Sequence, residues 1–263
     1  MFSLKGGVGK TTAAVNLAYA AATAGARRTL LWDLDAQGAA SFILGADAPG
    51  ETRARRLLAP DSRLLDAVRQ TAVPGLHLLA ADKSLRHLER QLADECGPLM
   101  LRRLLAEIAA HYDRVLLDCP PGFSALAEQI FRAADLIVEP MPPAPLAERA
   151  HDMLVEHLAK HHKGAPPLLP VFSMLDRRRN LHMAAIEAWP ERLALPYASA
   201  VERMAHERKA LGALAPVRRR HTPSSNSGPR RNVAWSPERT DPGGARLVCA
   251  TSRYCEIVTC RLS

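Results

Sequence analysis

The sequence predicts an α/β protein in which a mostly parallel β-sheet is covered by helices on both faces. Three observations favour this fold class. Short apolar runs bounded by turn signals recur along residues 1–215, helical periodicity lies between them, and a glycine-rich segment runs directly into the first helix. The chain has 263 residues, of which 48% are hydrophobic and 24% charged, so it has the composition of a globular protein and ample length for a buried core. In such a fold, ligands bind beyond the carboxyl ends of the strands.

The expected strands and helices alternate along the chain. The apolar runs that we expect to form buried strands are 29–32, 76–80, 115–117, 136–138 and 168–172. A first helix is expected over 13–24, because small apolar residues fill this stretch and Gly25 suits a helix C-terminus. Two later helices are indicated by residues at helical spacing, namely Leu85, Leu88 and Leu92, and then Leu101, Leu104, Leu105 and Ile108. Because strand–helix–strand connections are right-handed, this order predicts a largely parallel sheet.

The net charge of +8 is concentrated at the C-terminus. Residues 1–215 hold 26 Lys and Arg against 24 Asp and Glu, whereas residues 216–263 hold 9 Arg against 3 acidic residues. Arg, Pro, Ser, Gly and Thr dominate this last segment, and no amphipathic period survives in it. We therefore predict one domain over 1–215 and a tail, 216–263, that is disordered or read in a shifted frame. The charge of the domain alone gives no reason to expect a polyanionic partner.

The cysteines and the apolar runs indicate a cytoplasmic protein. The five cysteines occur at no spacing typical of a zinc site or of a disulfide framework, which fits a reducing compartment. No apolar run reaches 18 residues, so we expect no segment that crosses a membrane.

A phosphate-binding loop is predicted close to the start of the chain. Residues 4–12 read Leu-Lys-Gly-Gly-Val-Gly-Lys-Thr-Thr and run straight into the first expected helix. Glycines let consecutive backbone N–H groups face one anion, and the helix N-terminus adds a favourable dipole. Lys10 would neutralise the β- and γ-phosphates of ATP, and the Thr11 hydroxyl would ligate Mg²⁺. The predicted nucleotide-binding residues of the loop are Gly6, Gly7, Val8, Gly9, Lys10, Thr11 and Thr12.

The loop departs from the standard P-loop pattern at two positions. Leu4 stands where that pattern has glycine, and Lys5 adds a second lysine to the loop. One lysine is enough to hold the phosphates in cis, so the second needs another explanation. The string resembles the deviant Walker A motif of the ParA/MinD family of partitioning and positioning ATPases. The resemblance implies that Lys5 reaches across an ATP-dependent homodimer and stabilises charge that develops during γ-phosphate transfer.

Two later segments agree with this resemblance in order and spacing. Residues 33–38, Asp-Leu-Asp-Ala-Gln-Gly, look like the family's first switch, which implies that Asp35 orients the attacking water and that Asp33 supports the metal site. Residues 112–122 resemble its Walker B strand and second switch, which makes Asp118 a candidate Mg²⁺ ligand. The predicted catalytic residues are thus Lys5, Lys10 and Asp35, and the predicted metal ligands are Thr11, Asp33 and Asp118.

The segments expected near the nucleotide base are less specific. Residues 171–178 resemble the family's strand beside the base and 195–197 resemble its base-side loop, which implies adenine contacts from Asp176 and Pro196. The three arginines 177–179 that follow are either a DNA-facing patch or merely solvated charges.

The resemblance covers about residues 3–215 and implies a Mg²⁺-ATP-dependent dimerisation switch with slow ATP hydrolysis. Such a protein partitions DNA or positions another cargo. Its implied partners are a second copy of the chain, a ParB-like activating protein and non-specific DNA, with no membrane, and its implied location is the cytoplasm or the nucleoid. Only Met1–Leu4 precede the loop, so we expect a shortened first strand, which would weaken the sheet beneath the phosphates and with it ATP hydrolysis.

Two other functions fit parts of the sequence. A P-loop biosynthetic enzyme of the CobQ or dethiobiotin-synthetase type, which activates a carboxylate with ATP, would share the loop but would not need Lys5 in trans. ATP turnover that depends on a small carboxylic acid would favour it. Membrane switching of the MinD type requires a C-terminal amphipathic helix, and residues 216–263 offer none.

Overall fold

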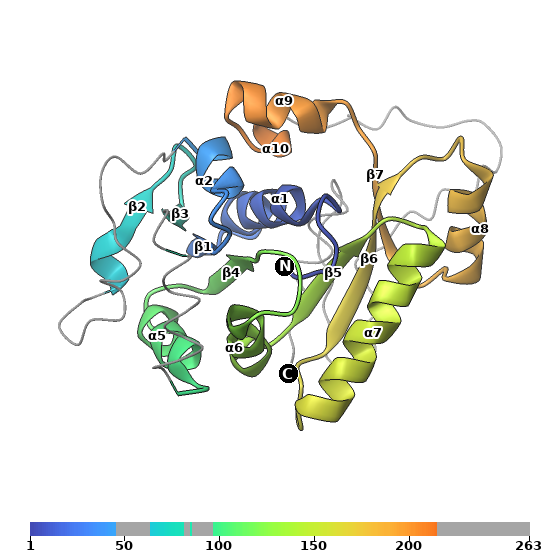
Figure 1. Cartoon of the computed structure of the whole chain (residues 1–263). Coiled ribbons are helices and arrows are strands. Elements are labelled where there is room, and N and C mark those ends of the chain that lie inside the picture. The colour runs from blue at the N-terminus through green and yellow to red at the C-terminus, as the bar shows by residue number, and fades with distance from the viewer. Residues whose placement is uncertain (46–63, 82–84, 86–96, 215–263) are drawn as a thin grey trace, which may run out of the picture.

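The computed structural model describes residues 1–45, 64–81, 85 and 97–214, in which strands and helices alternate (Figure 1). The five expected strands are all present, although most are longer by one to three residues than the apolar runs that indicated them. The strands are β1 Thr29–Asp33, β2 Val68–Gln70, β3 Leu76–Leu79, β4 Arg114–Asp118, β5 Ile137–Met141, β6 Leu168–Leu175 and β7 Leu193–Pro196. The sequence did not indicate β2 or β7, which are short and have partly exposed residues.

The strands form two sheets with the orders β2-β3-β1-β4 and β5-β6-β7. Every pairing is parallel except that of β2 with β3, so the prediction of a mostly parallel sheet is confirmed. The N-terminal residues bridge the two sheets. The Met1 ammonium donates a hydrogen bond to the Leu117 carbonyl of β4 at 2.6 Å, and the Phe2 N–H donates to the Val138 carbonyl of β5 at 3.0 Å.

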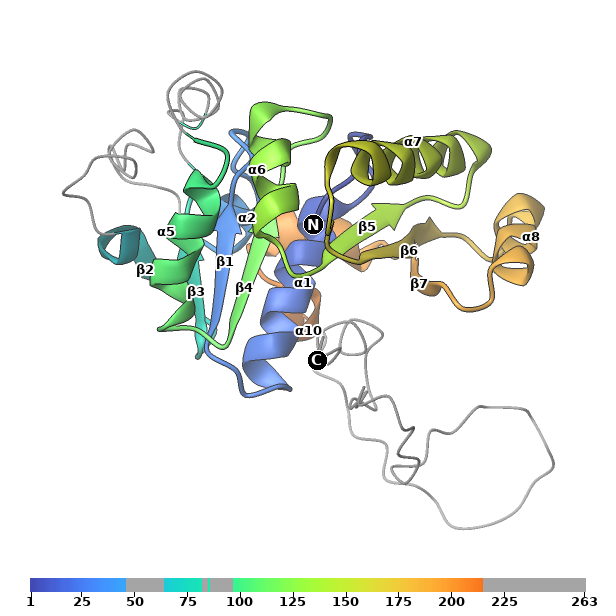
Figure 2. The same cartoon turned by 90° about the horizontal axis from the view of Figure 1, so that it is seen from below.

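Helices cover both faces of the sheets, as predicted (Figure 2). The helices are α1 Lys10–Thr23, α2 Ala39–Ile43, η1 Leu64–Ala67, α5 Met100–Ala109, α6 Ala125–Ala133, α7 Pro145–His161, α8 Asn180–Ala188, α9 Ala200–Glu207 and α10 Leu211–Leu214. One core packs Trp32 and Leu117 against α5, α6 and α7, and a second packs Leu31 and Leu78 against α1, α2 and α9. None of the helices within the described ranges is both long and apolar enough to cross a bilayer.

Two boundaries differ from the expectation. The first helix begins at Lys10 rather than at residue 13, because Gly9 adopts φ 87° and ends the loop there. It ends at Thr23, and the Gly25 N–H donates to the Ala20 carbonyl, as expected of a residue that terminates a helix. The helix indicated by Leu85, Leu88 and Leu92 lies outside the described residues except for the buried Leu85, and the tail 216–263 lies wholly outside them.

A buried asparagine attaches α10 to α1. The Asn16 amide nitrogen donates to the Thr12 carbonyl at 2.8 Å and contacts the Met204 sulfur at 3.3 Å, while its oxygen accepts from the Leu211 N–H at 2.8 Å. The residue is 3% exposed. Its polar side chain within an otherwise apolar helix face is therefore fully partnered.

Replacing Asn16 with alanine is expected to lower the free energy of unfolding by about 1–3 kcal/mol, because the partly buried Leu211 N–H loses its acceptor. Urea titration of the purified protein measures this change. The matched control is Asn180→Ala, which removes an exposed asparagine at the start of α8 and should change stability by less than about 0.5 kcal/mol. Equal stabilities of the two variants would contradict the assignment.

Candidate nucleotide-binding site

The loop before α1 has the backbone geometry that an anion requires. Gly7 and Gly9 have φ of 71° and 87°, values that residues with a Cβ rarely adopt. A Cβ built on Gly6 or Gly7 meets no described protein atom within 4 Å, so protein does not fill the space beside the loop. The loop leads into the N-terminus of a helix of 14 residues, whose free N–H groups and dipole favour a bound anion.

The loop is held to the second sheet by one side chain. The Ser173 hydroxyl of β6 donates a hydrogen bond to the Val8 carbonyl at 2.8 Å, and both residues are buried. This contact supplies the Val8 carbonyl with a donor from β6 and so anchors the loop to the second sheet. Nothing in the sequence motif pointed to Ser173, because it lies 165 residues from Val8 along the chain.

The two lysines of the loop have different surroundings. Lys10 is 7% exposed, and its Nζ donates to the Lys5 carbonyl at 3.0 Å. Burial lowers the pKa of Lys10, although Asp118 and Asp35 nearby act in the opposite direction. The Lys5 side chain is half-buried, and none of the described residues pairs with its ammonium group. Lys10 is thus fixed within the loop, whereas Lys5 is available to a group outside it.

Two buried aspartates lie side by side at the carboxyl ends of β1 and β4. Asp33 and Asp118 are register partners of these strands and are 0% and 1% exposed. One Asp33 oxygen accepts from the N–H and the hydroxyl of Ser41, both at 2.8 Å, and the other accepts from the Asp35 N–H at 3.2 Å. Burial raises the pKa of Asp33, and these hydrogen bonds oppose the rise.

The Asp118 carboxylate is the unsatisfied group of the site. Neither oxygen has a hydrogen-bond partner among the described residues. Burial and the adjacent Asp33 charge raise the pKa of Asp118 to about 7, although the Thr11 hydroxyl lies close enough to counteract part of the rise. A buried carboxylate without donors is costly unless a cation offsets it.

The residues present therefore fit a divalent cation. Hard oxygen ligands suit Mg²⁺, and the Thr11 hydroxyl and the Asp118 carboxylate supply them in one place. Asp33 already accepts three hydrogen bonds, so it is better placed to support this site through its neighbours than to bind an ion directly. Its support depends on Ser41, which also accepts from the Ala81 N–H at 2.9 Å and which the sequence did not single out.

Asp35 lies just beyond β1 in a tight turn. Its carboxylate accepts from the Gln37 N–H at 2.9 Å, and its carbonyl accepts from the Gly38 N–H at 2.8 Å. The side chain is half-buried, and its charge acts on Lys10. Asp35 is thus near the loop and retains one carboxylate oxygen that could orient a water molecule.

The two residues predicted at the base lie together, but one is already engaged. Pro196 of β7 pairs with Leu175 of β6, so it lies next to the start of the loop that carries Asp176. Both oxygens of Asp176 accept from the Arg178 guanidinium at 2.9 Å, and these hydrogen bonds lower the pKa of Asp176 to about 2. An adenine contact from Asp176 would therefore have to compete with Arg178.

A glycine-rich loop at a helix N-terminus, a buried lysine and two carboxylates at the adjacent strand ends together define a P-loop nucleotide-binding protein. Over residues 1–168 the sequence matches the family model of an AAA domain. The chromosome partitioning protein ParA of Caulobacter vibrioides is 35% identical over 188 residues, which span 67% of this chain and 69% of that protein. The chain therefore belongs to the ParA/MinD family of P-loop ATPases, as its loop predicted.

Solved structures agree with this assignment of the fold. The septum site-determining protein MinD of Pyrococcus horikoshii, complexed with Mg-ADP, superposes with a TM-score of 0.67 and 22% identity over 82% of this chain and 87% of that one. Cobyrinic acid a,c-diamide synthase of Mycobacterium smegmatis, with bound ADP and magnesium, gives a TM-score of 0.64 and 26% identity over 81% and 92%.

Proposed function

We propose that this protein is a Mg²⁺-ATP-dependent dimerisation switch that hydrolyses ATP slowly and partitions DNA or positions another cargo. The observation that carries the proposal is the pair of loop lysines. Lys10 is buried and bonded within its own loop, whereas Lys5 has no partner among the described residues. An ammonium group so placed can reach phosphates bound to a second copy of the chain.

The remaining site residues would take distinct roles. Lys10 and the N–H groups of residues 6–12 would hold the phosphates, and Thr11 and Asp118 would hold Mg²⁺, which offsets charge on the phosphates when it is bound. Asp33 would support the metal site through its hydrogen bonds to Ser41 and Asp35, and Asp35 would orient the attacking water. Pro196 would lie against the adenine, and Asp176 would do so on release from Arg178.

A test of the proposal compares the mass of the protein in solution with and without a non-hydrolysable ATP analogue and Mg²⁺. The parent is expected to change from monomer to dimer. Lys5→Ala should bind the analogue, because Lys10 and the loop remain, but should stay monomeric and hydrolyse ATP at least about 100-fold more slowly. The control is Lys209→Ala, which removes an exposed lysine after α9 and should behave as the parent does. A Lys5→Ala protein that dimerises and hydrolyses normally would refute the role of Lys5.

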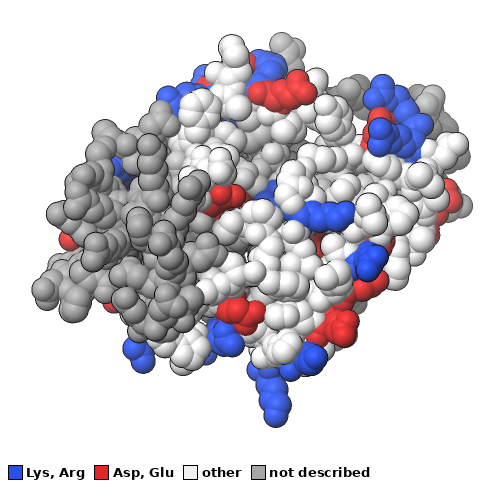
Figure 3. Space-filling model, in the orientation of Figure 1, with Lys and Arg blue, Asp and Glu red and all other residues white. Residues whose placement is uncertain are grey.

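The partners of the switch would follow from the family to which the chain belongs. A ParB-like protein would stimulate hydrolysis, and non-specific DNA would be a second ligand of the dimer. The face in Figure 3 shows cations and acidic residues interspersed rather than gathered in one large patch. Arg178 and Arg203 are paired with Asp176 and Glu207, which offset their charges, so these two arginines alone would not form a strongly cationic face for DNA.

A biosynthetic activity is the second candidate, and the likeness to cobyrinic acid a,c-diamide synthase favours it. In such an enzyme ATP would activate a carboxylate, and Lys5 would have no role in trans. ATP turnover that requires a small carboxylic acid, and that persists in Lys5→Ala, would favour this candidate over the dimerisation switch.

A further inference from the structure

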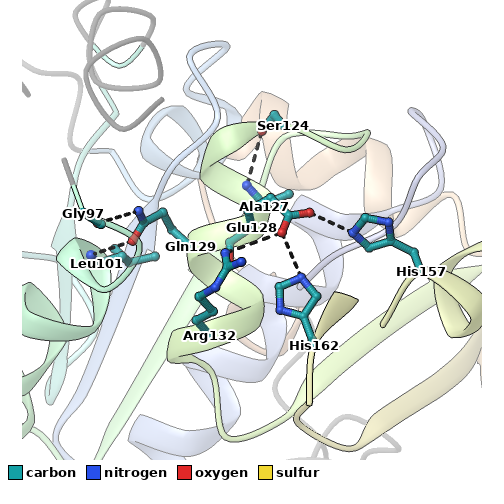
Figure 4. Close-up of polar contacts among 9 residues, drawn as sticks. All are labelled: Gly97, Leu101, Ser124, Ala127, Glu128, Gln129, Arg132, His157 and His162. Atoms are coloured by element: carbon teal, nitrogen blue, oxygen red, sulfur yellow. Dashed lines mark hydrogen bonds and ion pairs between the residues drawn. The ribbon is translucent and has the colours of Figure 1, made fainter. Parts of the chain in front are cut away.

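A second group of metal-ligating side chains lies away from the nucleotide site, where α6 packs against the C-terminal end of α7 (Figure 4). Glu128 of α6 contacts two histidines through separate oxygens. Its Oε1 lies 2.8 Å from His157 Nε2, and its Oε2 lies 2.8 Å from His162 Nε2. All three ligand atoms lie within 4.8 Å of one another. It is the only such group of three that the described residues contain.

We propose that Glu128, His157 and His162 form a binding site for one divalent transition-metal ion, with Zn²⁺ as the preferred ion. Two imidazoles and one carboxylate are a donor set that suits Zn²⁺, and Mg²⁺ binds poorly to imidazole nitrogen. Ligand atoms about 2.0–2.1 Å from a tetrahedral Zn²⁺ are roughly 3.3 Å apart. When the ion replaces the protons between these atoms, the two separations of 2.8 Å open by about half an ångström, and the ligand atoms that are now up to 4.8 Å apart move closer together.

The surroundings hold the two rings in place. The His162 side chain is 3% exposed and meets the Phe131 ring edge-on at 5.4 Å between centroids. The Phe123 and His157 ring centroids lie 4.2 Å apart. A surface cavity of about 360 Å³ adjoins the cluster, lined among others by Arg132, His161 and His162. Of the three proposed ligands this cavity is lined by His162 alone, and water entering from that side would supply the fourth ligand.

One neighbouring cation competes with a metal for the carboxylate. The Arg132 guanidinium lies 3.5 Å from Glu128 Oε2 and also donates to the Glu128 carbonyl at 2.9 Å. Its positive charge weakens the attraction for a second cation at the same oxygen. Removing this charge should therefore tighten metal binding, a result that a purely structural hydrogen-bond cluster would not produce.

The site connects to the segment that follows Asp118. Ser124 caps the N-terminus of α6, and its hydroxyl accepts from the Ala127 N–H at 3.3 Å. Phe123, the residue before it, contacts the His157 ring. Bound metal would tie α7 to this segment through Glu128. The proposed ion thus has a structural link to the nucleotide site without sharing any ligand with it.

The test is a titration of the full-length, nucleotide-free protein with Zn²⁺ in excess Mg²⁺, followed by calorimetry, and with Co²⁺, followed by absorption. The parent should bind one Zn²⁺ at this site and give the intense d–d bands of tetrahedral Co²⁺ without a sulfur-to-cobalt charge-transfer band. The last criterion distinguishes it from any binding by the cysteines of the chain.

The decisive variant is His157→Gln, because glutamine can still donate a hydrogen bond to Glu128 but is a poor Zn²⁺ ligand. It should weaken Zn²⁺ binding at least about 100-fold while it leaves the thermal unfolding of the metal-free protein nearly unchanged. Arg132→Gln should bind Zn²⁺ several-fold more tightly. The matched control is His161→Ala, since this exposed neighbour stacks on His157 but is not a ligand. Equal Zn²⁺ affinity in the parent and His157→Gln, or Co²⁺ spectra typical of octahedral oxygen coordination, would overturn the proposal.

Discussion

Lys10→Ala is expected to lower ATP turnover by at least about 100-fold. Lys10 is the first residue of α1, and the loop fixes its ammonium group through the Lys5 carbonyl at 3.0 Å. A charge that is already positioned stabilises the transferring phosphoryl group without further reorganisation. Steady-state phosphate release measures the loss.

The folded state should tolerate this change. Burial lowers the pKa of Lys10, which means that the fold disfavours its charged form when no anion is bound. Removing the ammonium group therefore costs little stability, and thermal unfolding of the nucleotide-free variant should match that of the parent closely. Lys160→Ala, at an exposed position of α7, should keep full turnover. Unchanged turnover in Lys10→Ala would be inconsistent with the loop as the phosphate site.

Asp118→Asn should have opposite effects on function and on stability. The amide removes a negatively charged ligand, so the response of ATP turnover to Mg²⁺ should be lost and turnover should fall by about 100-fold or more. In the absence of nucleotide and metal, the same variant should be more stable than the parent by about 1–3 kcal/mol near pH 8, because the parent buries a carboxylate without donors.

The pH dependence of this gain follows from the sign of the pKa shift. The pKa of Asp118 in the folded protein is about 7, above its ordinary value of 3.8. A raised folded-state pKa means that the parent loses stability as pH rises towards and through 7, and regains it on acidification. The advantage of Asp118→Asn should therefore shrink as the pH falls from about 8 to about 5. Chemical denaturation across this range measures it, with the exposed Asp152→Asn as the control. A gain that grows on acidification would contradict the assignment.

The sequence was sufficient for the features that depend on local patterns. Strand β1, whose five residues are all buried, was predicted from an apolar run in the sequence. The phosphate loop was predicted from glycines and lysines directly ahead of a helix. These features are local because a strand buried on both faces has no polar alternation, and a phosphate loop needs contiguous backbone groups.

The features that were missed depend on contacts between distant segments. Ser173 holds the Val8 carbonyl, and Ser41 holds Asp33, but an isolated serine in a sequence carries no signal of its partner. The cluster of Glu128 with His157 and His162 likewise exists only because α6 and α7 pack together. The engagement of Asp176 by Arg178 is a local contact, but the resemblance assigned Asp176 to the base without regard to its neighbours.

The hydrogen bond from Ser173 to Val8 makes the phosphate loop a junction between the two sheets. The helix that follows the loop packs on β1 and β4, whereas Ser173 belongs to β6, whose far end leads to Asp176 and pairs with Pro196. A base bound at the Asp176 end of β6 would contact the same strand that anchors the phosphate loop through Ser173. Contact with the adenine and binding of the phosphates would then be coupled through the Ser173 hydroxyl. A change at one end of the nucleotide would affect binding at the other end.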